Sequence, residues 1–331
     1  MKSYLKWIKN SKKIVLITHT DSDGICSAVL MHKVLKKLNK DYELKLASTN
    51  ILGMNSFYKK LPKADLYIFT DLAPDQNWET ASKYLNNRII IFDHHIPKKN
   101  LNSEKIIHIN TMFKSKKYTP ASKIVYDKFK EFLKKSKWVS CVGIYGDLGY
   151  LHWKEFFKGQ NMSQIKKIDR LIGSAMMFAG EKGAKFAFDS LKNSTKKQII
   201  KNRKLNEWHK KIENYLKKVE NDFEKKSWEF GDCIIFEFTP KYKISSALAT
   251  IVSLKRPDKT IILLNKNGND IKLNFRRQDG KLNVKKLAEE STRGIGTGGG
   301  HSRAAGGMIK REMKHVFIER IKALIKELKN E

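Results

Sequence analysis

Residues 14–24 read IVLITHTDSDG, a short apolar run that ends in a polar turn closed by glycine. Residues 14–18 have the length and β-branched content of a buried strand, and a helix is predicted over residues 25–38. Similar strand patterns follow at residues 44–47, 66–70 and 88–92. Because strands alternate with helices, we predict an α/β fold whose N-terminal domain is a parallel sheet with helices on both faces.

Aspartate and histidine side chains interrupt this apolar pattern at four places. We interpret each place as the carboxyl end of a strand, which is where open α/β sheets bind their ligands. The residues are His19, Asp21 and Asp23 after residues 14–18, Asp71 after 66–70, Asp93, His94 and His95 after 88–92, and Asp147 within 145–149.

This residue set suits divalent cations. Carboxylates with a few imidazoles favour Mn²⁺ as the bound ion, with Mg²⁺ or Co²⁺ as alternatives. Two ions about 3.5–4 Å apart can share a bridging carboxylate, generate a hydroxide nucleophile and stabilise charge on a phosphoryl group. A single Asp after a strand is more often a helix cap. The four places together instead predict a phosphoesterase with two divalent metal ions, because clustered carboxylates repel one another unless cations neutralise them.

The pattern resembles that of the DHH phosphoesterase superfamily, whose name-giving triplet is Asp93-His94-His95 here. Many members carry their first His four residues before the leading Asp, where this chain has Ile17, so the role of His19 as a ligand stays open. The resemblance implies the following roles: Asp71 bridges the two ions, His19 and Asp21 complete one site, Asp23, His94 and Asp147 complete the other, and His95 faces the substrate phosphate. Asp93 is interpreted as orienting the imidazoles, and Asp75 as a turn residue.

A second motif lies near the C-terminus, where residues 294–307 read GIGTGGGHSRAAGG. Repeated glycines let backbone N–H groups approach an anion, and the neighbouring His and Arg add donors. A flexible loop is the alternative, although the alanines favour tight packing. The segment resembles the Gly-Gly-Gly-His signature of the DHH-associated C-terminal domain, which binds the substrate strand. The implied substrate-binding residues are His95, Arg276, Gly298, Gly299, Gly300, His301 and Arg303, with Arg277 left open against Arg276 because a strand alternates faces.

The sequence predicts three parts: a DHH catalytic domain over residues 1–193, a connecting helix over 194–228 capped by Ser194 or Thr195, and a smaller α/β domain over 229–331. Leucine, isoleucine and aromatic residues recur at spacings of three and four in the connecting segment, which is typical of one long amphipathic helix. The smaller domain has predicted strands at 233–238, 260–265 and 271–276, a turn at Asn267-Gly268, and helices at 245–254, 284–290 and 312–329. We expect the active site in the cleft between the two domains.

The chain carries 67 basic and 34 acidic residues among 331, a formal net charge of +33. This excess favours a nucleic-acid partner, because phosphate neutralisation dominates such binding; a lysine-rich proteome is the alternative. No apolar run reaches the roughly 18–20 residues of a spanning helix, and no secretory signal is visible, so we expect no membrane association. Three widely separated cysteines (Cys26, Cys141 and Cys233) fit a reducing cytoplasm.

The resemblance implies a metal-dependent exonuclease of the compact RecJ-like type known from archaea. It would hydrolyse single-stranded DNA or RNA, or both, to mononucleotides in replication, repair or RNA turnover, with a replication or repair protein as a candidate partner. The first alternative is an oligoribonuclease or a cyclic or linear dinucleotide phosphodiesterase, and the second is a non-catalytic scaffold that binds nucleic acid. The charge favours long strands, because many phosphates are needed to use it.

Overall fold

A computed structural model of the chain describes residues 3–115 and 118–327, and it divides into two compact units, Met1–His209 and Lys210–Glu331. The boundary falls inside helix α10 (Arg203–Lys226), within the segment predicted to connect two domains. Across the described ranges, no helix combines the length and the apolar character that crossing a membrane requires. The two units are described separately below.

Unit 1 contains a five-stranded sheet in the order β2-β1-β3-β4-β5, with every neighbouring pair parallel. This confirms the predicted parallel sheet. The strand β5 was not predicted, because it has four residues and stands between polar stretches. Since all five strands run the same way, their carboxyl ends lie at one edge of the sheet. The strands are β1 (Ile14–His19), β2 (Glu43–Ala47), β3 (Leu66–Thr70), β4 (Arg88–Phe92) and β5 (Ile106–Ile109).

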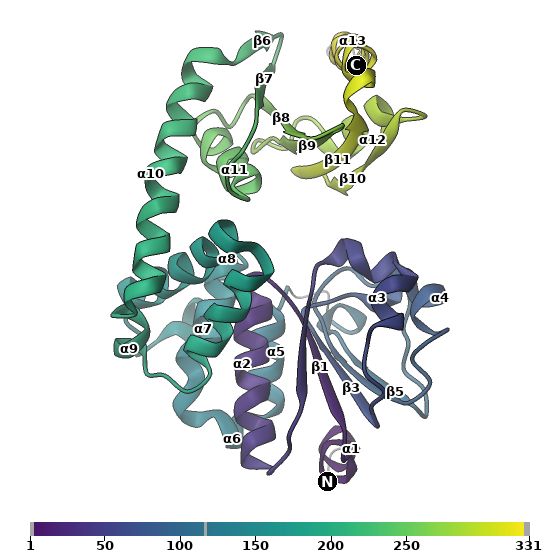
Figure 1. Ribbon diagram of the computed structural model, residues 1–331, viewed down its shortest axis with the longest axis vertical. Helices are drawn as coiled ribbons and strands as arrows, with labels where there is room; N and C mark the ends of the chain where they lie inside the picture. The colour runs from purple at the N-terminus through teal and green to yellow at the C-terminus, as the bar shows by residue number, and fades with distance from the viewer. Residues whose placement is uncertain (1–2, 116–117, 328–331) are drawn as a thin grey trace. The chain divides into compact units, whose positions relative to one another are not determined.

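Helices cover both faces of this sheet, as Figure 1 shows. Leu16, Ile68 and Ile90 point toward α2, α5, α7 and α8, whereas Phe69 and Ile91 point toward α3 and α4. Burial of each such side chain contributes about 1.5–3 kcal/mol to the free energy of folding. The sheet is therefore rigid enough to position the residues at its edge. The helices of unit 1 are α1 (Ser3–Asn10), α2 (Ser22–Lys37), α3 (Asn55–Lys59), α4 (Trp78–Ala81), α5 (Ala121–Lys128), α6 (Lys130–Leu133), α7 (Lys137–Gly146), α8 (Met162–Leu191) and α9 (Lys196–Ile200).

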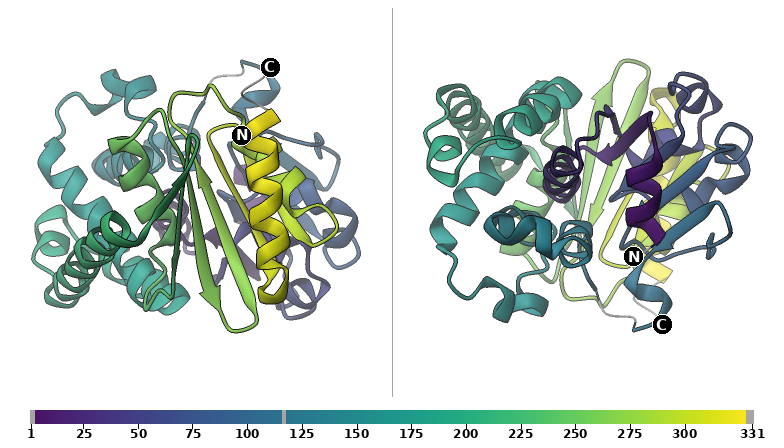
Figure 2. Two further views of the ribbon diagram at one scale, coloured as in Figure 1. Left: turned by 90° about the horizontal axis from the view of Figure 1, so that it is seen from above. Right: turned by 90° about the horizontal axis from the view of Figure 1, so that it is seen from below.

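Unit 2 is a smaller α/β unit with a six-stranded sheet in the order β10-β11-β9-β8-β7-β6. Only β7 and β8 pair in parallel, so the sheet is mixed. Figure 2 (left) shows α13, in yellow, alongside the strands, and Phe317 of that helix meets Phe275 of β9 edge to face. The elements are β6 (Trp228–Phe230), β7 (Cys233–Phe238), α11 (Ser245–Lys255), β8 (Thr260–Asn267), β9 (Asp270–Arg276), α12 (Val284–Thr292), β10 (Gly296–His301), β11 (Ala304–Lys310) and α13 (Lys314–Glu327).

The segment 194–228 is not one helix, which corrects the prediction. It contains α9 and α10, separated at Lys201 and Asn202. Thr195, and not Ser194, caps α9 through a reciprocal capping box with Gln198. The break has a local cause: Asn202 Oδ1 accepts a hydrogen bond of 3.0 Å from the N–H of Leu205 and so starts a new helix. The apolar periodicity continues across the break, which is why the sequence alone predicted one helix.

The glycine-rich segment forms the hairpin of β10 and β11, so the flexible-loop alternative is wrong. Glycine is required there by close packing. A Cβ on Gly298 would lie 2.3 Å from the carbonyl oxygen of Ala288 in α12. The strand therefore approaches the helix more closely than any other residue would allow, which agrees with the tight packing that the alanines indicated.

Candidate metal centre

The turn after β1 holds three of the predicted residues. His19 is the last residue of β1, and Asp21 caps the N-terminus of α2 by accepting a 2.9 Å hydrogen bond from the N–H of Gly24. Asp23, in the first turn of α2, is almost fully buried. A Cβ on Gly24 would lie 2.4 Å from the carbonyl oxygen of His19. The glycine thus lets the turn fold back on the end of the strand and brings its two carboxylates to the sheet edge.

The next two strands deliver Asp71 and the Asp93-His94-His95 triplet. Asp71 follows β3 directly and has a φ of 58°, in the left-handed region that non-glycine residues rarely adopt. Its N–H donates a 2.9 Å hydrogen bond to the carbonyl oxygen of Phe92, the last residue of β4. A strained backbone held by such a bond fixes the direction of the side chain, and it is typical of functional sites.

Asp147 does not follow a strand, which corrects the sequence interpretation. It is the C-cap of the buried helix α7. The residues of α7 are apolar on almost all sides, and a buried helix segment cannot be told from a buried strand by periodicity alone. The helix nevertheless ends beside the sheet edge, so Asp147 reaches the same place as the strand-end residues.

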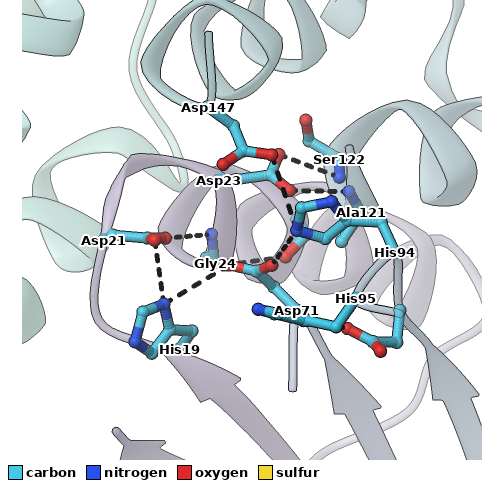
Figure 3. Close-up of polar contacts among 12 residues, drawn as sticks. His19, Asp21, Asp23, Gly24, Asp71, His94, His95, Ala121, Ser122 and Asp147 are labelled. Atoms are coloured by element: carbon cyan, nitrogen blue, oxygen red, sulfur yellow. Dashed lines mark hydrogen bonds and ion pairs between the residues drawn. The ribbon is translucent and has the colours of Figure 1, made fainter. Parts of the chain in front are cut away.

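The predicted residues meet around Asp71, which lies between His19 and His94 in Figure 3. Asp71 Oδ1 lies 3.1 Å from His94 Nε2, and Asp71 Oδ2 lies 3.6 Å from His19 Nδ1. His19 Nδ1 is also 2.9 Å from Asp21 Oδ2, and His94 Nε2 is 3.5 Å from Asp147 Oδ2. One carboxylate therefore faces two clusters of donor atoms, one with each of its oxygens.

These donor atoms form three overlapping groups that could each hold a cation. Within each group, ligand atoms of the three residues lie within 4.8 Å of one another. The groups are His19, Asp21 and Asp71; Asp23, His94 and Asp147; and Asp71, His94 and His95. The first two contain the residues of the two sites that the family resemblance implied, except that Asp71 is absent from the second; Asp71 belongs to the first and third groups.

Helix α5 and the side chain of Tyr118 donate hydrogen bonds to the carboxylates of Asp23 and Asp147. The first two N–H groups of α5 donate to Asp23, from Ala121 to Oδ2 at 2.6 Å and from Ser122 to Oδ1 at 3.1 Å. The hydroxyl of Tyr118 donates to the Oδ2 of Asp147 and to its carbonyl oxygen, the latter at 2.6 Å. A helix N-terminus and a half-buried phenol therefore restrict the orientations of the two carboxylates.

The clustered charges shift the pKa values of the site in the directions expected when no cation is bound. Burial and the charges of Asp71 and Asp147 raise the pKa of Asp23 well above its usual value. Burial also raises the pKa of Asp147, although the positive charge of His94 opposes that shift. Burial would lower the pKa of His94, but the carboxylates of Asp71, Asp147 and Asp23 raise it to about 10. Protonated imidazole thus supplies the positive charge that the carboxylates need.

Asp93 is fully buried and orients His95. Its Oδ1 lies 2.7 Å from His95 Nδ1, and the side chain of Asn110 donates a 2.8 Å hydrogen bond to the carbonyl oxygen of His95. The interpretation of Asp93 as an orienting residue agrees with this contact. Burial would lower the pKa of His95, whereas the contact with Asp93 raises it. Since Nδ1 faces Asp93, the other nitrogen of this partly exposed ring is the one presented to a ligand.

Divalent ions fit this set of residues. Asp71 Oδ2 and His94 Nδ1 are buried and find no hydrogen-bond partner among the described residues. An unsatisfied buried carboxylate oxygen costs a large desolvation free energy, and a cation beside it would offset that cost. Oxygen and imidazole ligands of this kind suit Mn²⁺, Mg²⁺ and related ions.

In unit 2 the structure separates the roles of Arg276 and Arg277. Arg277 is buried and makes two bonds to Asp279, from Nε to Oδ1 at 2.8 Å and from Nη2 to Oδ2 at 3.0 Å. Arg276 is less buried and donates only to Ser246 Oγ, at 3.1 Å, among the contacts described. The guanidinium of Arg277 is thus occupied by contacts within unit 2, whereas that of Arg276 remains accessible to a ligand.

The other predicted substrate-binding residues of unit 2 lie at one end of its sheet. Ala304 of β11 pairs with His301 of β10 on one side and with Arg276 of β9 on the other. His301 and Arg303 are exposed, and Arg303 lies in the turn that joins β10 to β11. Gly298, Gly299 and Gly300 lie in β10 itself. His301 of β10, Arg276 of β9 and Arg303 of the joining turn therefore share one end of the sheet.

The sequence interpretation missed the groups that donate hydrogen bonds to the carboxylates of the site, which are Tyr118 and the N-terminus of α5. Pro120 before Ala121 is a signal for a helix start, so the helix could have been predicted. Its role toward Asp23, which is nearly a hundred positions earlier in the chain, is visible only once the chain is folded.

Two family models match the chain. The DHH family, N-terminal domain, matches residues 13–148, and the DHHA1 domain matches residues 233–327. The first match contains the Asp and His cluster, and the second contains the glycine-rich hairpin. The chain belongs to the DHH superfamily. No curated protein matches its sequence.

Solved structures share the fold of this DHH-superfamily chain at low sequence identity. An exonuclease RecJ bound to manganese matches with a TM-score of 0.73 and 14% identity, over 97% of this chain and 91% of that one. RecJ from Thermus thermophilus in complex with Mn²⁺ matches with 0.75 and 12%, over 98% of this chain but 53% of that one, so this chain spans about half its length. A pGpG-specific phosphodiesterase from Vibrio matches with 0.56 and 14%, over 96% and 99%. The fold is RecJ-like.

Proposed function

We propose that this protein is a metal-dependent exonuclease that hydrolyses single-stranded DNA or RNA, or both, to mononucleotides. The observation that carries the proposal is the position of Asp71, whose two oxygens face two separate clusters of donor atoms. Two divalent ions held there, Mn²⁺ in first place, would activate a water molecule and offset negative charge on the phosphoryl group. The likeness to manganese-bound RecJ supports the same chemistry.

The residues around Asp71 would have distinct roles in metal binding and substrate binding. Asp71, His19 and Asp21 would hold one ion, and Asp23, His94 and Asp147 would hold the other. Asp71 would also contribute to the second ion, because its Oδ1 lies 3.1 Å from His94 Nε2. Each imidazole must give up its proton to become a ligand, so metal binding should release protons and weaken as the pH falls. His95 is held by Asp93 with one nitrogen and turns the other toward the substrate. Because the contact with Asp93 raises its pKa, His95 suits a phosphate oxygen as a cationic donor.

Unit 2 would bind the phosphates of the strand. Arg276 remains accessible while Arg277 is paired, and His301 and Arg303 share its end of the sheet. The net charge of +33 extends such contacts beyond a single phosphate. The sequence also has basic stretches at residues 97–99 and 114–117, for which loops are predicted. Residues 97–99 lie outside helices and strands, and residues 116–117 lie outside the described part of the chain.

The first experiment follows the products of end-labelled single-stranded DNA and RNA with Mn²⁺. We expect a ladder that shortens from one end to mononucleotides, and no activity in excess EDTA. A circular single strand should resist, because an exonuclease needs an end; rapid cleavage of the circle would show endonuclease action instead. Asp71→Asn should be inactive, while Asp65→Asn, just before the opposite end of the same strand, should retain activity. Full activity in EDTA, or an active Asp71→Asn enzyme, would refute the metal mechanism.

A second experiment separates long strands from dinucleotides, which the likeness to the pGpG-specific phosphodiesterase makes the main alternative. The specificity constant is measured on strands of two, five, ten and twenty nucleotides at two salt concentrations. For long strands we expect affinity to fall by about 0.7 logarithmic units per phosphate contact for each tenfold rise in salt. Arg276→Ala and His301→Ala should weaken long substrates more than dinucleotides, with exposed Lys272→Ala on the same strand as the control. A maximum at two nucleotides would favour the dinucleotide enzyme, and binding without cleavage would favour a scaffold.

A further inference from the structure

A second cluster of carboxylates and imidazole lies behind the DHH triplet. Asp75 is in the short 3-10 helix Pro74–Asn77, Asp93 follows β4, and His108 is in β5. The three side chains are buried, with exposed fractions of 3%, 0% and 3%. One donor atom of each lies within 4.8 Å of the others. None of the three belongs to the two clusters around Asp71 that were assigned to the catalytic ions.

Each residue of this cluster has a buried polar atom without a hydrogen-bond partner among the described residues. Asp75 Oδ1, Asp93 Oδ2 and both ring nitrogens of His108 make no hydrogen bond to any described residue. Burying a polar group without a partner costs roughly 2–7 kcal/mol, and a carboxylate costs more. Two carboxylate oxygens and an imidazole buried together without partners are therefore unfavourable, unless one donor atom from each surrounds a ligand.

The remaining oxygens of the two carboxylates are held firmly. Asp75 Oδ2 accepts hydrogen bonds from the N–H groups of Lys98, at 2.7 Å, and Lys99, at 3.3 Å. Asp93 Oδ1 contacts His95 Nδ1 at 2.7 Å. Each carboxylate is thus anchored through one oxygen and presents the other to the cluster, as carboxylate ligands of metals commonly do. Asp75 is accordingly more than the turn residue that the sequence indicated.

The charge of the cluster points to a cation. Among the described residues, neither Asp75 nor Asp93 pairs with a lysine or arginine side chain; Asp93 contacts the imidazole of His95, whereas Asp75 has only backbone N–H donors and keeps an unbalanced charge. One donor atom of His108 lies within 4.8 Å of a carboxylate oxygen of each aspartate, and burial lowers the pKa of His108 although the two carboxylates oppose that shift. A water molecule would satisfy hydrogen bonds but leave the negative charge in place. A divalent cation would do both, and two carboxylates with one imidazole suit a transition-metal ion.

We propose that Asp75, Asp93 and His108 bind one divalent transition-metal ion, separate from the ions around Asp71. The ion joins three segments, the turn after β3, the end of β4 and β5. Since Asp93 also contacts His95, the ion fixes the carboxylate that orients this imidazole. The site is structural, because its burial leaves no path for a strand of nucleic acid. It stands whether or not the proposed exonuclease function is correct.

The test counts metal ions per chain. The full-length protein is stripped with EDTA, loaded with Mn²⁺ or with Zn²⁺, desalted and analysed by mass spectrometry of the elements. His108→Phe removes the ligand and keeps an aromatic ring beside Phe113, whose ring centroid is 4.8 Å away. We expect this variant to hold one ion fewer than the wild type. His32→Phe is the matched control, because His32 is also buried but is hydrogen bonded to Tyr42 at 2.9 Å.

The same comparison is made in an Asp71→Asn background, which disables the centre around Asp71. One ion per chain should remain in Asp71→Asn and should be lost in Asp71→Asn/His108→Phe. Zn²⁺ should raise the melting temperature of the first protein and not of the second, as ligand linkage requires. Asp75→Asn repeats the test should His108→Phe not fold. Equal metal contents with and without these substitutions would overturn the proposal and leave a buried water in its place. If His108→Phe loses one ion but Asp71→Asn loses none, only the proposed function would be contradicted.

Discussion

Replacing Asp169 by Asn should stabilise the metal-free protein at neutral and basic pH. Asp169 lies in α8, and its Oδ1 accepts a 2.6 Å hydrogen bond from Ser22 Oγ, between Asp21 and Asp23. Burial raises the pKa of this carboxyl from 3.8 to about 6 against the opposing Ser22 bond, and the charge of Asp21 adds to the shift. Asn keeps the acceptor for Ser22 and removes the charge.

The size of the effect follows from the two pKa values. As the pH rises from 3.8, the unfolded chain loses its proton first, while the folded protein keeps it until about pH 6. The free energy of unfolding of the wild type therefore falls over this interval and stays reduced above it. At about 1.36 kcal/mol per unit, the upper bound is about 3 kcal/mol. Because the side chain is partly exposed, screening leaves about 1–2 kcal/mol, or about 3–6 °C in melting temperature.

The assay is thermal denaturation in EDTA, followed by circular dichroism from about pH 4 to about pH 8. The melting temperature of Asp169→Asn minus that of the wild type should be near zero at the acidic end and reach its full value above about pH 6. Asp65→Asn serves as a control of opposite sign, because hydrogen bonds from the N–H groups of Lys13 and Lys12 lower the pKa of that exposed carboxyl. A difference that does not change with pH, or an Asn variant less stable at basic pH, would show this reasoning to be wrong.

Three further outcomes are expected. Asp71→Asn should lower turnover by at least about 10²–10³-fold, as loss of one major electrostatic contributor does, and added Mn²⁺ should not restore the rate measured on labelled strands. Arg277→Ala should destabilise unit 2 by about 3 kcal/mol in urea unfolding, because the contacts of a buried guanidinium with Asp279 are lost, whereas Arg276→Ala should unfold like the wild type and bind strands more weakly. Gly298→Val should lower stability by about 1–3 kcal/mol or more, since its side chain would overlap Ala288; an unchanged melting curve would contradict the close packing of β10 on α12.

The sequence by itself determined the sheet of unit 1 and most of the candidate site. Residues 66–70 and 88–92 were predicted to the residue, because each is a β-branched or apolar run of strand length bounded by turn residues. The parallel order then placed Asp71 and the His94 segment at one edge without any further information, since parallel strands end on the same side. Local composition was sufficient to predict the position of a residue wherever that position depends only on the strand that the residue follows.

Only the tertiary structure decided the features that depend on packing between distant segments. Asp147 reaches the site from the end of a buried helix, which has the same apolar pattern as a buried strand. The fold buries Arg277 against Asp279, whereas Arg276 is more exposed and contacts Ser246. The glycine-rich segment is a strand because α12 packs against it, and composition alone disfavours a glycine strand. Asp75 and His108 meet only through the fold, because the contact between them joins a turn to a strand that is too short to predict.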